Sequence, residues 1–154
     1  MKTLIVYDSY FGNTEKVALA IRNVLGNEAL AVRVRDVKLK QLSGLDALIV
    51  GSPTRAFKAT GAITGFLKQI PARSLTGVKA AAFDTRMDVT DITSRLLEKL
   101  VRWLGYAAEP IAARLQKKGA RLAVKPAGFS VQGSEGPLKT GELERAVEWA
   151  KQIG

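Results

Sequence analysis

The segment of this sequence best suited to bind a ligand is a short run of polar and small residues near the amino terminus. It reads Asp8-Ser9-Tyr10-Phe11-Gly12-Asn13-Thr14 and joins an apolar run at residues 3–7 to an amphipathic stretch at residues 14–25. Such a strand-to-helix turn can direct backbone N–H groups and hydroxyls at an anion, and the helix amino terminus adds roughly half a positive charge. The spacing matches neither a Walker loop nor a G-x-G-x-x-G turn. An ordinary helix cap, with Asn13 or Thr14 as the cap and Gly12 turning the chain, is the alternative interpretation.

Apolar periodicity predicts strands that alternate with helices along the chain, which is typical of right-handed βαβ units. We expect the α/β class: one domain over residues 1–154, with a doubly wound, five-stranded parallel sheet and helices on both faces. Ligands of such folds bind beyond the carboxyl ends of the strands, which directs attention to loops 8–14, 52–60 and 84–91. The predicted strands are 3–7, 31–35, 47–51, 79–83 and an interrupted fifth at 121–124 and 129–131, and the helices are 14–25, 63–70, 92–104, 108–115 and 143–153.

Composition narrows the chemistry. The chain has no Cys and no His, which excludes thiolate and Ser-His-Asp catalysis as well as zinc sites built on these residues. Redox chemistry would therefore need a bound organic cofactor. The 24 Lys and Arg residues against 14 Asp and Glu give a net charge of +10, which favours anionic partners such as phosphates, acidic proteins, nucleic acid or acidic membrane surfaces. The sequence shows no signal peptide and no apolar run long enough to span a membrane, so we expect a cytoplasmic location.

Three segments together resemble the flavodoxin family. Ser9-x-x-Gly12-Asn13-Thr14 after Ile5-Val6-Tyr7 is similar to the family's FMN phosphate loop. Val50-Gly51-Ser52-Pro53-Thr54 resembles its second flavin loop, and Ala82-Phe83-Asp84-Thr85-Arg86 stands where the third begins. The stretch from Gly136-Pro137-Leu138 to Gly141-Glu142-Leu143 also looks like some members. The resemblance implies a flavodoxin-like sheet with strand order 2-1-3-4-5, FMN as cofactor, and electron transfer as function.

The resemblance also implies a set of site residues. Ser9, Gly12, Asn13 and Thr14 would hold the phosphate, whereas the second and third loops would border the ring and ribityl chain. The family's usual hydroxyl residue at the third loop position is replaced by Phe11. Arg55 and Arg86 stand near the expected ring, where a guanidinium plane can stack on it. The full set of expected cofactor-binding residues is Ser9, Tyr10, Phe11, Gly12, Asn13, Thr14, Ser52, Pro53, Thr54, Arg55, Phe57, Asp84, Thr85 and Arg86.

Several functions remain open at this point. The first is an FMN-binding electron carrier, a monomer or small homo-oligomer that serves acidic redox-partner proteins. The second is an FMN-dependent oxidoreductase of the quinone-reductase or porphyrinogen-oxidising type, whose substrate pocket residues 86–105 could wall. The third is a regulatory domain that holds an anion without redox chemistry. No basic-aromatic motif favours specific nucleic-acid binding. The predicted helix 92–104, which carries Trp103, is interpreted as sheet cover, a lid over the flavin or a docking face.

Overall fold

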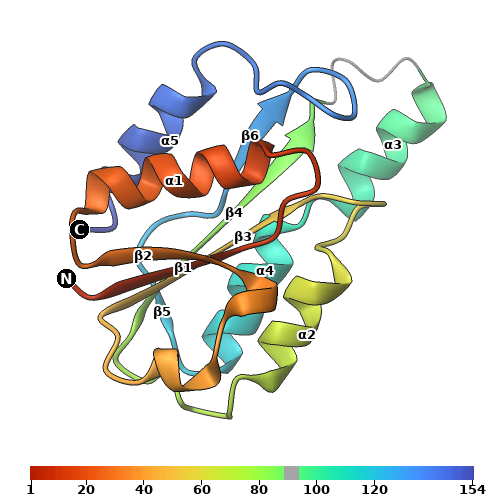
Figure 1. Cartoon of the computed structure of the whole chain (residues 1–154). Helices are drawn as coiled ribbons and strands as arrows, with labels where there is room; N and C mark the ends of the chain where they lie inside the picture. Colours follow the sequence, from red (N-terminus) through yellow and green to blue (C-terminus); the bar gives the residue numbers. More distant parts are fainter. Residues whose placement is uncertain (89–93) are drawn as a thin grey trace.

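A computed structural model describes residues 1–88 and 94–154, and its centre is a parallel sheet (Figure 1). The strands lie in the order β2-β1-β3-β4-β5, and β6 also pairs with β4. This order confirms the predicted doubly wound α/β fold. The strands are β1 (Thr3–Tyr7), β2 (Ala29–Arg33), β3 (Ala47–Pro53), β4 (Lys79–Met87), β5 (Arg121–Leu122) and β6 (Ala127–Val131).

The predicted interrupted fifth strand is present as two segments beside β4. β5 pairs with the first residues of β4, where Lys79 is opposite Arg121. β6 pairs with the last residues, from Phe83 opposite Ala127 to Met87 opposite Val131. The sheet therefore has five strand positions but six strand segments. Because β6 supplies partners to its second half, β4 continues to Met87, beyond the residues 79–83 that the sequence predicts.

Helices cover both faces of the sheet (Figure 1). Because β1 residues alternate between the faces, Leu4 and Val6 pack with α2 and α4, whereas Ile5 and Tyr7 pack with α1 and α5. No helix in the described ranges is long and apolar enough to cross a membrane. The helices are α1 (Asn13–Leu25), α2 (Gly61–Gln69), α3 (Arg95–Leu104), α4 (Ala108–Lys117) and α5 (Glu142–Lys151), with 3₁₀ turns at Val34–Asp36 and Leu39–Leu42.

Besides β4, the bounds of β2 and of the helix after β4 differ from the sequence-based prediction. β2 pairs with β1 from Ala29, opposite Thr3, to Arg33, so the strand predicted at 31–35 begins and ends two residues too late. The chain leaves the sheet at Val34, whose side chain turns into the core from the first residue of a 3₁₀ turn. The helix predicted at 92–104 is described from Arg95 to Leu104. Residues 89–93, which include the end of the predicted third loop, lie outside the described residues.

Candidate functional site

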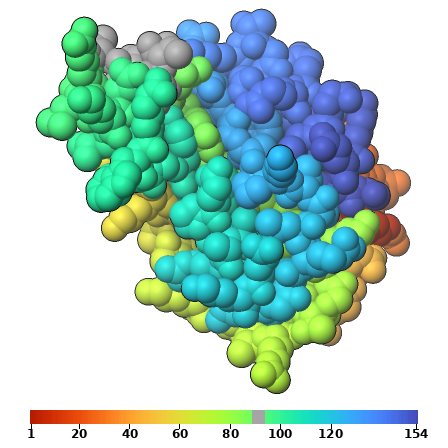
Figure 2. Space-filling model, turned by 180° about the vertical axis from the view of Figure 1, so that it is seen from behind, coloured from red at the N-terminus to blue at the C-terminus, as the bar shows by residue number. Residues whose placement is uncertain are grey.

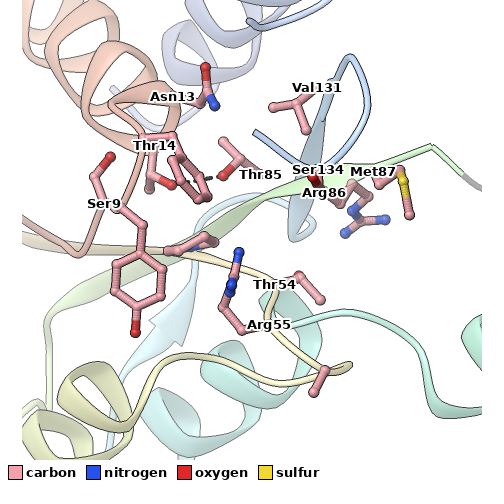
Figure 3. Close-up of a pocket in the computed structure, with 14 residues that line it drawn as sticks. Ser9, Asn13, Thr14, Thr54, Arg55, Thr85, Arg86, Met87, Val131 and Ser134 are labelled. Carbon is pink, nitrogen blue, oxygen red and sulfur yellow. Dashed lines mark hydrogen bonds between the residues drawn. The ribbon is translucent and has the colours of Figure 1, made fainter. Parts of the chain in front are cut away.

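A cavity of about 430 Å³ lies at the carboxyl ends of the strands, where the strand order reverses between β1 and β3 (Figure 3). Its walls come from the loops that follow β1 and β3, from the end of β4 and from the end of β6. This is the place that the fold class predicts for a ligand. The lining residues are Ser9, Tyr10, Phe11, Asn13, Thr14, Pro53, Thr54, Arg55, Ala56, Thr85, Arg86, Met87, Val131 and Ser134.

The first loop is closed on itself by one hydroxyl. Ser9 Oγ accepts hydrogen bonds from the backbone N–H groups of Gly12 (3.1 Å) and Glu15 (3.4 Å). Gly12, at φ 88°, makes the left-handed turn into α1 that a side chain would disfavour. The N-cap position is Gly12, which has no side chain to offer, and neither Asn13 nor Thr14 caps the helix, so the alternative of an Asn13 or Thr14 cap is not what the structure shows.

The turn leaves a cluster of unused hydrogen-bond donors at the cavity. Among the described residues, the backbone N–H groups of Tyr10, Phe11, Asn13 and Thr14 have no acceptor. Asn13 and Thr14 are buried, with 7% and 1% of their surface exposed. A buried N–H without an acceptor is costly, and here the donors stand at the positive end of the α1 dipole. An anionic group with several acceptor oxygens, such as a phosphate, fits this arrangement.

A polar network under the loop fixes its position. Arg33, at the end of β2, donates from Nη1 to the carbonyl oxygen of Ser9 (3.2 Å) and forms an ion pair with Glu15. The Tyr7 hydroxyl donates to Glu15 Oε2 (3.0 Å). Burial, followed by this hydrogen bond, raises the pKa of Tyr7 above its usual value. Three elements, β1, β2 and α1, therefore hold the loop before any ligand binds.

Two side-chain contacts connect the first loop to the other walls. The Asn13 amide donates from Nδ2 to the carbonyl oxygen of Glu135 (2.8 Å), which fastens the loop after β6. Gly136 packs against the Asn13 side chain, and a Cβ atom at position 136 would lie only 2.6 Å from Asn13 Oδ1. The hydroxyls of Thr14 and Thr85 share a hydrogen bond of 2.7 Å, drawn as the dashed line in Figure 3. Asn13 and Thr14 thus present their backbone N–H groups to the cavity while their side chains join its walls.

Arg86 is the most firmly held cation of the cavity. Its Nε and Nη2 each donate to a carboxylate oxygen of Asp84 at 2.6 Å. Asp84 is fully buried and also accepts from the backbone N–H of Ala108 (2.9 Å), at the start of α4. Burial raises the pKa of the Asp84 carboxyl, and Arg86 and the Ala108 N–H oppose that rise. The pair carries no net charge when both groups are ionised.

The Arg86 guanidinium is also packed on its faces. Its Cζ lies 3.7 Å from the centre of the Tyr106 ring, which is close cation–π stacking. A Cβ on Gly128 of β6 would come within 2.1 Å of the guanidinium, so only glycine leaves room for it there. Burial raises the pKa of the Tyr106 hydroxyl. Arg86 is therefore fixed in place rather than free to follow a ligand.

Arg55 sits on a tight hairpin and faces the aromatic residues of the first loop. Reciprocal backbone hydrogen bonds of 2.8 and 2.9 Å join Arg55 to Lys58, and the two residues between them, Ala56 and Phe57, have φ values of 46° and 70°. This is the geometry of a two-residue primed turn, here made without glycine. The Arg55 guanidinium lies 5.2 Å from the Tyr10 ring centre and 5.7 Å from that of Phe11.

The structure brings most of the residues predicted from the sequence to one cavity. Four of them stand behind its wall instead: Gly12 makes the turn, Ser52 Oγ accepts from the Thr60 N–H (3.0 Å), Asp84 holds Arg86, and Phe57 lies in the hairpin turn. Their contact with a cofactor stays a prediction.

Sequence reasoning missed other parts of the wall. Met87, Val131 and Ser134 line the cavity because β4 is longer than predicted and because the loop after β6 returns to α1. Ala56 joins them from the hairpin. Tyr106, which stacks on Arg86, follows the Gly105 that ends α3. An aromatic residue just before a helix gives no sequence signal of such stacking, so this contact needed the structure.

Solved structures share the whole fold with this chain. A flavodoxin from the domain Archaea matches at a TM-score of 0.78 and 24% identity, over 99% of this chain and 96% of that one. Oxidised Flavodoxin 1 from Bacillus cereus matches at 0.76 and 19%, over 99% and 97%. Rubredoxin oxygen:oxidoreductase from Desulfovibrio gigas matches at 0.74 and 21%, over 98% of this chain but 34% of that larger one. These identities establish the fold.

The family is established by a match between this sequence and a family model. No curated protein matches the chain at a significant level. The model of the flavodoxin domain family does match, over residues 4–140, a range that holds the described strands except Thr3 of β1, together with all the lining residues of the cavity. The strand order, the cavity at the strand reversal and this match agree, and we conclude that the chain belongs to the flavodoxin domain family.

Proposed function

We propose that this protein binds FMN in the cavity at the carboxyl ends of the strands and transfers electrons through it. Membership of the flavodoxin family makes it a flavodoxin-like electron-transfer protein of the FMN-binding kind. The geometry supports a proposal for the atoms that would hold the cofactor. The observation that carries the assignment is the set of backbone N–H groups without acceptors at Tyr10, Phe11, Asn13 and Thr14.

The phosphate of FMN would take these N–H groups, with Ser9 Oγ holding the loop in the receptive conformation. A terminal phosphate monoester carries the charge and the several acceptor oxygens that a ring of N–H donors requires. A neutral flavin such as riboflavin would leave the donors without acceptors. We therefore expect FMN to bind far more tightly than riboflavin.

The ribityl chain and ring would lie along the rest of the cavity. Thr54 and Thr85 present hydroxyl-bearing side chains there, while Tyr10, Phe11, Met87 and the two arginines provide flat or apolar surface. When bound, FMN supplies one- and two-electron chemistry that no side chain of this chain can perform. The protein's part is to bind the cofactor, exclude water from one side of it and set the local charge.

A spectrum tests the proposal first. The purified protein should be yellow, and acid or heat denaturation should release FMN, identified by chromatography against FAD and riboflavin. A colourless protein that does not take up added FMN would support the anion-binding regulatory alternative instead.

Carrier and enzyme are distinguished by turnover. We propose a carrier, so the FMN-loaded protein should exchange electrons with small redox proteins, acidic ones fastest, and should show no more than slow NAD(P)H oxidation with a quinone. Rapid NAD(P)H–quinone turnover would favour the oxidoreductase alternative. This proposal also includes a single domain over residues 1–154 and a cytoplasmic location. Cell fractionation tests the location.

A further inference from the structure

Helix α3 (Arg95–Leu104) exposes an unusually large apolar surface. Trp103 has 82% of its surface exposed, Leu96 has 71% and Leu104 has 47%. Only Val101 of this helix is buried. The helix stands out at one corner of the molecule, as the space-filling view in Figure 2 shows. Isolated exposed leucines are ordinary, but a tryptophan and several leucines together on one short helix indicate an interaction surface.

The exposed apolar residues form one continuous face. At 3.6 residues per turn, the apolar side chains of α3 occupy an arc of about 160° and its charged side chains occupy the opposite side. Val101 stands at one edge of this arc and contacts the body of the protein, so most of the arc points to solvent. The apolar residues are Leu96, Leu97, Leu100, Val101, Trp103 and Leu104, and the charged residues are Arg95, Glu98, Lys99 and Arg102.

The helix does not serve the cofactor cavity in this structure. None of its residues lines that cavity, so α3 is not a lid over it here. It nevertheless lies at the same end of the sheet, because it follows the carboxyl end of β4 (Figure 1). At its end, Gly105 leads directly to Tyr106, which stacks on the cavity residue Arg86. A surface that bound α3 would therefore lie beside the cavity.

The charges of α3 and of the whole chain indicate which kind of surface would bind this helix. Three basic residues and one acidic residue make up the polar side of α3, and the Glu98–Arg102 ion pair (2.9 Å) neutralises one of each. Arg95 and Lys99 remain to face the surroundings. The whole chain carries +10, so a second copy of it would be repelled as it approached, whereas an anionic surface would be attracted.

We infer that α3 is a membrane-surface helix, which places its apolar face in the outer layer of an anionic lipid bilayer while its basic side chains meet the headgroups. A short helix with Trp and Leu on one face and Lys and Arg on the other is the arrangement that binds in the plane of a bilayer surface. Tryptophan prefers that interface, and the long Lys and Arg side chains can reach the headgroups from it. A convex helix that projects from the body fits a soft, flat surface better than a preformed protein groove.

This inference does not depend on the bound cofactor. If the proposed function is also correct, the consequence is that the flavin exchanges electrons at the membrane surface, with partners held there. If the protein binds no FMN, the binding of α3 to lipid would be unchanged. A failure of the proposed FMN function can therefore be distinguished from a failure of the membrane inference.

Vesicle co-sedimentation tests the inference. The full chain should sediment with phosphatidylglycerol vesicles and stay in solution with phosphatidylcholine vesicles, and added salt should weaken the binding. Trp103 provides a second readout: its emission should shift to the blue with phosphatidylglycerol and become protected from an aqueous quencher. Trp149, the other tryptophan, is already buried at 7% exposure and should not respond.

Two variants separate apolar insertion from charge attraction. The double variant Leu96→Ser, Trp103→Ser should lose about tenfold or more in affinity for phosphatidylglycerol vesicles while its thermal unfolding stays unchanged, because both side chains are exposed. The matched control Leu30→Ser changes a leucine with 52% exposure on the edge strand β2 and should bind as the wild type does.

Three results would overturn the inference. The first is no binding to phosphatidylglycerol vesicles, which would direct attention to an acidic protein as partner. The second is equal binding by the double variant, which would show that net charge alone is responsible. The third is a doubled mass in light scattering that Trp103→Ser abolishes, which would make α3 a contact between copies of this chain.

Discussion

Residues 9–14 offer backbone N–H groups to the cavity, whereas the loop after β3 and the end of β4 offer it the side chains of Arg55 and Arg86. We call these the amide end and the arginine end. The amide end is fixed by the Ser9–Gly12 hydrogen bond inside the loop, by Arg33 of β2 and by the bond from Asn13 to Glu135 in the loop after β6. Its donors are in place before a ligand binds, so little conformational entropy is lost on binding.

The arginine end contains two cations in opposite situations. Arg86 is locked by Asp84, Tyr106 and Gly128 and is electrically balanced by the buried carboxylate. Arg55 has no carboxylate partner among the described residues and rests on Tyr10 and Phe11. Two arginines that line the same cavity can therefore differ in their electrostatic effect on a bound flavin. Arg86 mainly stabilises the structure, whereas the charge of Arg55 is free to act on the flavin.

The largest effect should come from breaking the Asp84–Arg86 pair. Asp84→Ala leaves a guanidinium without its carboxylate and the Ala108 N–H without an acceptor, so the free energy of unfolding should fall by about 3–5 kcal/mol in urea titrations. Adding Arg86→Met to Asp84→Ala should recover part of that loss. If Asp84→Ala unfolds like the wild type, Arg86 is not held as we describe.

The next effect concerns the amide end. Replacing Asn13 or Thr14 with Ala removes a contact that positions the loop, to Glu135 or to Thr85, and should weaken FMN binding by about tenfold. Riboflavin affinity should change less, since that ligand has no phosphate. Asn23→Ala, in the same helix but exposed, is the control. Equal losses for both flavins would show that this loop does not hold the phosphate.

The two arginines should differ in their effect on redox potential. A cation near the flavin favours its negatively charged reduced form, so Arg55→Gln should lower the midpoint potential by several tens of millivolts. Arg86→Gln should shift the potential less. Burial already raises the pKa of the Asp84 carboxyl, so without Arg86 this carboxyl should take up a proton, and the net charge near the flavin would then stay the same. Lys58→Gln controls for a general loss of charge, and an unchanged potential in Arg55→Gln would contradict the distinction.

The smallest effect should be a dependence of stability on pH behind the amide end. Glu142 accepts hydrogen bonds from Arg145 and from the Ser130 N–H, and the Arg145 contact lowers the pKa of its carboxyl below the ordinary 4.5. A lowered pKa stabilises the folded state above pH 4.5, and this contribution is lost as pH falls through the folded value. In Glu142→Gln, urea unfolding should lose that part of its pH dependence. Glu144→Gln, an exposed carboxylate in the same turn, should keep it.

The features that the sequence predicted are those set by local pattern. Short apolar runs such as 47–51, placed between helical patterns, favour buried strands, and this predicted the sheet. The polar turn 8–14 stands between a predicted strand and a predicted helix, and this predicted the first loop. The interrupted fifth strand was also predicted, because apolar residues resume at Phe129 after the break.

The features that it did not predict depend on contacts across the chain. The Asn13–Glu135 bond joins residues 122 positions apart, and the Asp84–Ala108 bond joins residues 24 apart. The i, i+2 spacing of Asp84 and Arg86 did not predict their ion pair. A regular strand directs two such side chains to the same face, but this does not fix the rotamers that bring them into contact. The sequence did not predict the solvent exposure of α3 either, because its amphipathic pattern also fits a helix that covers the sheet.

The most direct test of the central claim is a calorimetric titration of the cofactor-free protein with FMN and with riboflavin. Our account predicts that FMN binds at least about a hundredfold more tightly, since several charge-assisted hydrogen bonds to the phosphate are lost with riboflavin. Inorganic phosphate should compete with FMN at high concentration. Equal affinities for the two flavins, or no binding of FMN at all, would contradict the account.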